Sequence, residues 1–242
     1  PLLQRFYART VNEFVAGHDR NGNGIVDASS ANGWGIASTY NELPGIVLAE
    51  SADSLGAQRR AFNAYAYFMR ARGDHPGAQA WTAKAERLKR VFNDTWYDAA
   101  AGRYLVGFDH PHRRPVSAFG YETSWFIPYT ELCEPGPRAA AYLDFIHNSF
   151  QAKPSPNIEA WTYLPDVFYA WNQNERGWRY FKRVLDSKSS YPEVSFTVIS
   201  HVATRIMGIE PDAHGRSVST LARLPAEVDW VQLDHVPVGR ND

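Results

Sequence analysis

Two glutamates lie in loops that lead into helix-like segments near opposite ends of this chain. Glu42 lies within residues 31–44, and Glu193 lies within residues 190–196. Cleavage of a glycosidic bond uses one carboxylic acid that protonates the leaving oxygen and one carboxylate that activates a water molecule. Two carboxylates from distant loops, brought together beside aromatic rings, would provide both groups. The types and positions of Glu42 and Glu193 therefore predict this chemistry.

The neighbours of each glutamate indicate which role it would take. Glu42 is flanked by Tyr40 and Leu43, and apolar company favours the protonated form that a general acid needs. Glu193 follows Pro192 at a predicted helix start, where the helix dipole and free amides favour the charged form that a general base needs. An inverting enzyme holds two such groups ~6.5 to 9.5 Å apart. We assign Glu42 as the acid and Glu193 as the base.

Both glutamates also have a purely structural interpretation, and other carboxylates compete for both roles. A glutamate in the first turn stabilises a helix without any catalytic role, and Glu42 would be solvated in an open loop. The alternatives for the acid are Asp27, Glu50 and Asp53. The alternatives for the base are Glu122 and Glu159, which begin predicted helices and would otherwise hydrogen-bond sugar hydroxyls.

Three tryptophans, Trp34, Trp125 and Trp161, lie in or beside loops. Flat indole rings stack on sugar faces and their N–H group donates to hydroxyls, so these residues predict sugar contacts, with core packing as the alternative. Other tryptophans on regular helical faces are predicted to be core, namely Trp81, Trp96 and Trp178. The complete set predicted to bind substrate is Trp34, Tyr40, Glu50, Glu122, Trp125, Glu159 and Trp161.

The segment from Asp19 to Asp27 carries the sharpest short motif. The oxygens of Asp19, Asn21, Asn23, Ile25 (through its carbonyl) and Asp27 occupy the positions 1, 3, 5, 7 and 9 of an EF-hand-like calcium loop. The twelfth position, normally a glutamate, is Ser30. Two interpretations follow: a structural calcium site completed by a ligand from elsewhere, or a turn held by side-chain-to-backbone hydrogen bonds.

Hydrophobic periodicity predicts helices on either side of the candidate site residues. A stripe of Trp81, Ala85, Leu88 and Phe92 has the spacing of one helical face. A turn and a short strand pair are predicted over residues 98–109, and an alternating tail over residues 216–238 indicates β structure. Helices are predicted over residues 2–16, 45–72, 159–172, 175–186 and 194–207, with two more that begin at Pro76 and Pro137.

Composition excludes several functional classes. The 242 residues include 25 Lys and Arg against 26 Asp and Glu, so no basic excess predicts nucleic-acid or anionic membrane binding. No apolar run approaches the ~18 residues of a membrane span. The single cysteine, Cys133, excludes an internal disulfide and leaves the compartment open. No Gly-rich phosphate loop follows a predicted strand.

Two segments resemble a known group of enzymes. Residues 79–105, with AERLKRVFNDTWYD at 85–98 and then GRY at 102–104, resemble the six-hairpin glycosidases, whose fold is the (α/α)6 toroid and which include glucoamylase-like and α-L-rhamnosidase-like members. Residues 191–196 together with MGIEPD at 207–212 are similar to the final helix and exit of that fold. The similarity extends over about residues 18–238.

The resemblance implies an all-α fold, a toroid of helical hairpins that is incomplete in this chain at about eight helices, followed by a short C-terminal β appendage. Residues 1–212 would be the toroid and residues 213–242 the start of a small β element. Residues 2–16 would be its fifth helix, which makes the chain a C-terminal fragment. The acid would then lie in the loop after that helix and the base in the loop at 187–193. Because Gly35 follows Gly33-Trp34 where α-glucosidase members carry aspartate, the acid stays open among Glu42, Asp27, Glu50 and Asp53.

The implied activity is hydrolysis of a glycoside or oligosaccharide with inversion, without a required cofactor. Two alternatives are a sugar phosphorylase or epimerase of the same fold and a non-catalytic carbohydrate-binding protein. Phosphate dependence of turnover would identify a phosphorylase, and tolerance to loss of both glutamates would identify a binding protein. The sequence does not determine the sugar, the linkage or the oligomeric state.

Overall fold

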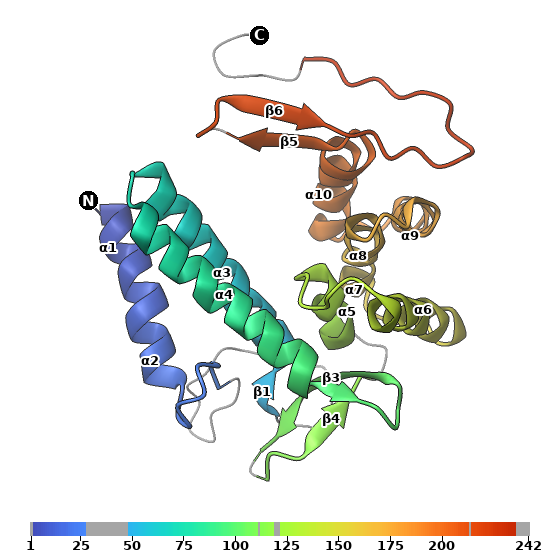
Figure 1. Ribbon diagram of the computed structural model, residues 1–242. Helices are drawn as coiled ribbons and strands as arrows, with labels where there is room; N and C mark the ends of the chain where they lie inside the picture. Colours follow the sequence, from blue (N-terminus) through green and yellow to red (C-terminus); the bar gives the residue numbers. More distant parts are fainter. Residues whose placement is uncertain (1, 28–47, 111, 119–121, 213, 236–242) are drawn as a thin grey trace. The chain divides into compact units, whose positions relative to one another are not determined.

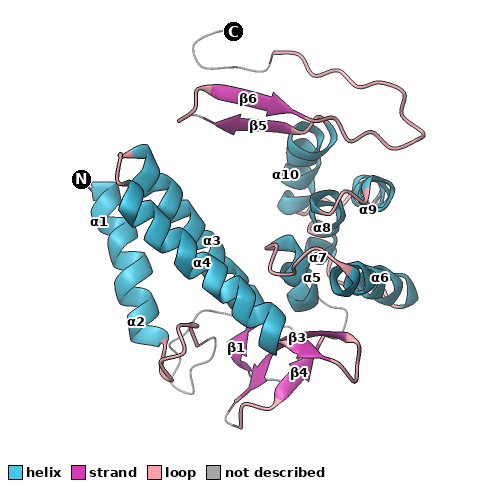
Figure 2. Cartoon of the chain, in the orientation of Figure 1, coloured by secondary structure: helices cyan, strands magenta, loops and turns pink. Residues whose placement is uncertain are grey.

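The computed structural model describes residues 2–27, 48–110, 112–118, 122–212 and 214–235 (Figure 1). The chain divides into two compact units, Pro1–Lys153 and Pro154–Asp242. In the described residues the first unit is mostly helical, and helices are the main regular structure of the second, as Figure 2 shows. No described helix is both long enough and apolar enough to cross a bilayer.

The first unit begins with one continuous helix, built from α1 (Leu2–Arg9), the π-helical segment η1 (Thr10–Phe14) and α2 (Val15–His18). The prediction of a helix over residues 2–16 is confirmed. Val11 points into the core, but Phe6 and Phe14 are exposed. The inward face of this helix is therefore narrower than its apolar residues suggest.

A long helical hairpin follows, formed by α3 (Ala52–Ala71) and α4 (His75–Thr95). Asp74 caps α4 by accepting a hydrogen bond from the Gly77 amide at 2.9 Å, the usual arrangement for an aspartate before a helix with proline in its first turn. The Trp81 ring packs edge-on against Phe62 and Tyr65 of α3. The predicted stripe on α4 is buried throughout, at Trp81, Ala85, Leu88 and Phe92.

The prediction of a helix over residues 45–72 is wrong over its described N-terminal part, because Leu48–Ser51 form strand β1. β1, β2 (Tyr97–Asp98) and β4 (Pro115–Ser117) each pair antiparallel with β3 (Arg103–Asp109). All four β1 residues are buried. A side-chain carbon at Gly107 of β3 would collide with the Glu50 carbonyl oxygen, so the close pairing depends on glycine there.

The first unit is completed by α5 (Glu122–Tyr129) and α6 (Pro137–Ala152). The Trp125 ring of α5 packs against Phe150 of α6, with ring centroids 5.7 Å apart. The helix predicted to begin at Pro137 is confirmed.

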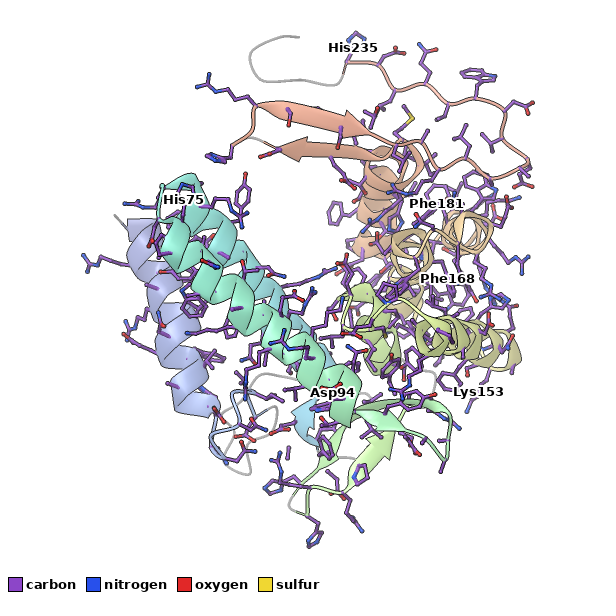
Figure 3. The ribbon with its side chains drawn as sticks, viewed as in Figure 1. His75, Asp94, Lys153, Phe168, Phe181 and His235 are labelled. Atoms are coloured by element: carbon purple, nitrogen blue, oxygen red, sulfur yellow. The ribbon has the colours of Figure 1, made fainter. Side chains whose placement is uncertain are left out.

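The second unit contains α7 (Ile158–Trp161), α8 (Leu164–Ala170), α9 (Asn174–Asp186), α10 (Pro192–His201) and the π-helical η3 (Val202–Ile206). The helix predicted over residues 159–172 is therefore divided into α7 and α8. Phe168 of α8 stacks on Tyr180 of α9 at 5.1 Å, and Figure 3 shows Phe168 and Phe181 among the side chains that fill this unit. Gly177 of α9 leaves room for the ring of Tyr169.

A hairpin of β5 (Ile209–Asp212) and β6 (Ser217–Thr220) follows η3. Of the tail predicted as β structure, residues 217–220 form a strand, whereas residues 221–235 do not. The position of the domain boundary at residue 212 stays a prediction.

Candidate functional site

The structure describes only one of the two predicted catalytic glutamates. Glu42, together with Trp34 and Tyr40, lies outside the described residues. Glu193 lies in the first turn of α10, where its side chain is exposed. The backbone at Tyr191 is extended and turns into the helix at Pro192. The predicted helix start at Glu193 is confirmed, and its catalytic role stays a prediction.

A hydrogen bond joins the start of α10 to the start of α7. The Tyr191 hydroxyl donates to Oε2 of Glu159 at 3.0 Å. Asn157 caps α7 because its Oδ1 accepts from the Glu159 amide at 3.1 Å. The carboxylate of Glu159 is thus held close to the segment that leads into Glu193. Tyr191 was not among the predicted site residues, although its place directly before Pro192 makes it part of the same loop.

Of the tryptophans predicted to contact sugar, the two that the structure describes, Trp125 and Trp161, are engaged in packing. Trp125 is only 1% exposed and lies in the core of the first unit. Trp161 is half-buried, and its indole N–H donates to the Ser155 carbonyl at 2.8 Å. The Arg183 guanidinium lies over the same ring, 4.7 Å from its centroid. The structure therefore directs the Trp161 N–H into the protein, and sugar contacts by either ring stay predictions. The structure does not describe the side chain of Glu122.

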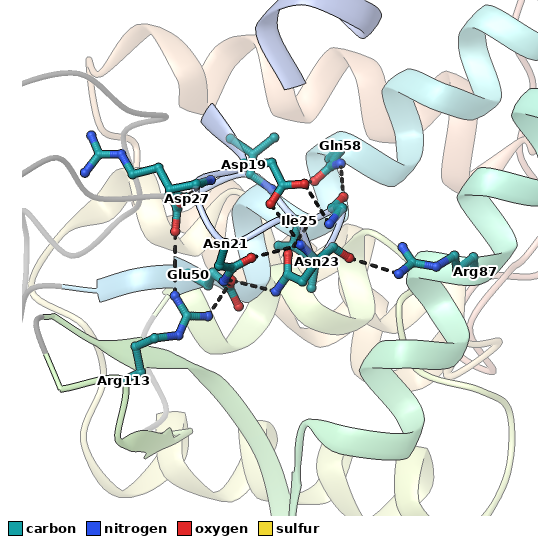
Figure 4. A network of polar contacts seen from close by, with 12 residues as sticks. Asp19, Asn21, Asn23, Ile25, Asp27, Glu50, Gln58, Arg87 and Arg113 are labelled. Atoms are coloured by element: carbon teal, nitrogen blue, oxygen red, sulfur yellow. Dashed lines mark hydrogen bonds and ion pairs between the residues drawn. The ribbon is translucent and has the colours of Figure 1, made fainter. Parts of the chain in front are cut away.

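The Asp19–Asp27 loop is held by its own side chains (Figure 4). Asp19 accepts hydrogen bonds from the Asn23 and Gly24 amides at 3.1 and 2.8 Å. Asn21 accepts from the Asn23 amide at 3.0 Å, and Asn23 accepts from the Ile25 amide at 2.8 Å. The prediction of a turn held by side-chain-to-backbone hydrogen bonds is confirmed.

A buried carboxylate from β1 completes the network around this loop. Oε1 of Glu50, which is 2% exposed, accepts from Nδ2 of Asn21 at 2.9 Å and from Nδ2 of Asn23 at 2.8 Å. Nη2 of Arg113 donates to the same oxygen at 2.5 Å. Nη1 of Arg113 also lies 3.7 Å from Oδ1 of the buried Asp27. An oxygen that accepts three hydrogen bonds, one from a cation, suits an ionised carboxylate.

Three further hydrogen bonds fix this loop to the helical hairpin. Gln58 of α3 accepts from the Val26 amide at 3.1 Å and donates to the Gly24 carbonyl at 2.8 Å. Nη2 of Arg87, on α4, donates to the Asn23 carbonyl at 3.0 Å. The loop is therefore anchored on both helices of the hairpin.

These contacts determine what calcium binding at the loop would require. Glu50 supplies a carboxylate from outside the loop, as the calcium interpretation requires, and carboxylate and amide oxygens are the ligands that calcium takes. However, the guanidinium of Arg113 already lies against both Asp27 and Glu50. A calcium ion would have to displace Arg113, and Asn21 and Asn23 would have to turn their amide oxygens toward it. Calcium binding at this loop stays a prediction.

The second unit contains a cluster of polar and charged side chains that was not predicted from the sequence. His201 of α10 lies 3.0 Å from Oδ2 of Asp166 on α8, and Nε of Arg205 donates to the other oxygen of Asp166. Burial raises the pKa of Asp166, but the hydrogen bonds and charges of His201 and Arg205 outweigh it, so the pKa of Asp166 is lowered overall. His201 and Arg205 are four residues apart, a spacing that places both on one helical face.

Comparison with known proteins gives a similarity in fold. No family model matches the chain, and no curated protein sequence matches it. Among solved structures, the chain is similar to a GH78 family rhamnosidase of Bacillus sp. GL1, with a TM-score of 0.61 and 14% identity. The similarity covers 88% of this chain and 25% of the rhamnosidase, so this chain spans a quarter of that protein's length. The two proteins are alike in fold over nearly all of this chain.

Proposed function

We propose that this chain forms part of a glycoside hydrolase that cleaves an O-glycosidic bond with inversion. Similarity in fold to a GH78 rhamnosidase supports this proposal. We assign the helices to an (α/α)6 toroid of helical hairpins, with residues 1–212 in the catalytic domain and residues 213–242 at the start of a small β element. The substrate is a glycoside or an oligosaccharide.

The observation that carries the proposal is the position of Glu193. Its exposed carboxylate lies in the first turn of α10, beside the hydrogen bond between Tyr191 and Glu159. Unpaired amides at a helix start favour the ionised form of a carboxylate, and an exposed carboxylate is accessible to water. We therefore assign Glu193 as the general base that activates water, with Glu159 as a neighbouring group that binds sugar hydroxyls.

We assign Glu42 as the general acid. Glu50 is a poorer candidate for the acid because its Oε1 is already occupied by hydrogen bonds from Asn21, Asn23 and Arg113. Asp27 is also a poorer acid, since Arg113 lies against its carboxylate. Both residues instead organise the first unit around the Asp19–Asp27 loop, which precedes the segment that contains Glu42.

The experiment is a pair of glutamine variants assayed on a panel of p-nitrophenyl glycosides that includes the α-L-rhamnoside. Glu193→Gln should lower kcat by ~10² to 10⁴ because it removes a general base, while the circular dichroism spectrum stays unchanged. Glu210→Gln is the matched control, since Glu210 is exposed on β5 of the same unit. Activity of Glu193→Gln within a few-fold of the Glu210→Gln value would refute the assignment.

A further inference from the structure

A cavity of about 300 Å³ lies in the first unit, where the N-terminal helix faces α3 and α4. Its floor is apolar. Val11 and Val15 line it from the N-terminal helix, and Phe62, Trp81 and Leu88 line it from the hairpin. All of these except Val15 are buried. This cavity is separate from the carboxylates that we assign to sugar chemistry.

The mouth of the cavity is cationic. Lys84 and Arg87 line it from one face of α4, three residues apart, and both are exposed. Nζ of Lys84 lies 3.8 Å from the centroid of the Trp81 ring, at the border between floor and mouth. Arg87 donates to the Asn23 carbonyl, and a guanidinium carries five N–H donors. Among the described residues, no aspartate or glutamate lines the cavity.

Size and lining together define the class of ligand. Cavities that bind small molecules measure ~300 to 1,000 Å³, so this one suits a small ligand. An apolar floor would leave the hydroxyls of a sugar without hydrogen-bond partners, at a cost of ~1 to 3 kcal/mol for each buried group. A short hydrocarbon chain suits the floor, and an anionic head suits the two cations at the mouth.

We propose that this cavity binds a small amphiphilic carboxylate. The hydrocarbon tail lies between Val11, Phe62 and Leu88, and the carboxylate lies between Lys84 and Arg87. This proposal does not depend on the glycosidase assignment, because none of the residues that we assign to catalysis lines the cavity.

The test is isothermal titration calorimetry of the 242-residue chain with octanoate, 1-octanol and octylamine, which share a chain length and differ in head-group charge. In low salt, octanoate should bind at least about threefold more tightly than octanol, and octylamine most weakly, since exposed ion pairs contribute ~0.2 to 1 kcal/mol each. About 0.5 M NaCl should remove most of the preference for octanoate, because exposed charges are screened. Equal affinities for the three ligands, or no octanoate binding at millimolar concentration, would overturn the proposal.

Variants locate the site. Lys84→Gln should weaken octanoate binding by about threefold and leave octanol binding unchanged, whereas Lys89→Gln, on the same helix but outside the lining, should change neither. Ala16 lines the cavity from the N-terminal helix, so Ala16→Leu should fill the cavity and abolish binding of both ligands. Octanoate affinity that is unchanged in Lys84→Gln, or binding that survives in Ala16→Leu, would place the ligand elsewhere and contradict the proposal.

Discussion

Glu50→Gln is the substitution that best tests the network around the Asp19–Asp27 loop. Glutamine keeps the shape of the side chain but removes the negative charge that Arg113 and the two asparagine amides contact. It also places an amide N–H group beside the N–H groups of Asn21, Asn23 and Arg113, which are all hydrogen-bond donors. The expected result is loss of stability in the first unit.

The magnitude follows from burial of the two partners. A hydrogen bond to a charged group contributes ~1.5 to 3 kcal/mol, and breaking a fully buried ion pair costs ~3 to 5 kcal/mol. The side chain of Glu50 is 2% exposed, but that of Arg113 is 40% exposed, so water screens part of the interaction. We therefore expect Glu50→Gln to lower the free energy of unfolding by about 2 kcal/mol, which in a unit of this size lowers the Tm by about 4 to 8 °C.

Thermal unfolding followed by circular dichroism measures the shift, and hydrogen exchange of the Leu48–Ser51 amides localises it to β1. Glu13→Gln is the control, because Glu13 pairs with Arg9 on an exposed helix face where the side chains are 67% and 78% exposed. That change should cost less than about 0.5 kcal/mol. If Glu50→Gln and Glu13→Gln shift the Tm equally, the network does not stabilise the unit as described.

Three further predictions concern single residues. Gly24→Ala should destabilise the first unit by ~1 to 2 kcal/mol in urea unfolding, because Gly24 has a φ of +85° and a side chain there would strike the Arg87 guanidinium. Gly17→Ala is the control, since Gly17 lies in open space, and equal effects of the two changes would contradict the prediction. When calcium replaces a chelator in the buffer, the Tm of the unaltered chain should stay the same and the Tm of Arg113→Gln should rise, because Arg113 supplies the positive charge beside Asp27 and Glu50. A calcium-dependent rise in the Tm of the unaltered chain would refute this. Because the pKa of Asp166 is lowered in the folded state, its contribution to stability is present above its unfolded pKa of ~3.9 and is lost as pH falls through the lower folded value. Asp166→Asn should flatten the dependence of the unfolding free energy on acid pH, and an unchanged dependence would contradict this.

Most helices of this fold can be predicted from the sequence. α4 has an aspartate cap, a first-turn proline and an apolar stripe of helical spacing, and every residue of that stripe is buried. These signals are local, so they need no knowledge of the rest of the chain. The same holds for the strand pair predicted over residues 98–109, which appears as β2 and β3.

β1 was not predicted because its structure depends on a distant partner. Residues 48–51 are all buried although their sequence, Leu-Ala-Glu-Ser, does not alternate between apolar and polar residues. The local pattern therefore does not indicate a strand. The pairing with β3, more than fifty residues later, decides the outcome. The exposure of Ile199, an apolar residue of α10, likewise depends on packing that the local sequence does not specify.

The loop motif was predictable and its surroundings were not. The spacing of Asp19, Asn21 and Asn23 predicted side chains that accept hydrogen bonds from loop amides, and the structure has these bonds. The contact of Arg113 with Glu50 joins segments 63 residues apart, and nothing in the local sequence of either residue indicates it. The pairing of Tyr191 with Glu159 is a similar case.

The most direct test of the central claim is the proton NMR spectrum of the sugar released in the first moments of glycoside cleavage by this protein. A general acid and a general base that act on opposite faces of the ring release the anomer opposite to that of the substrate. We predict this inverted anomer. Initial release of the retained anomer would show that a carboxylate attacks the sugar directly and would contradict the roles assigned to Glu42 and Glu193.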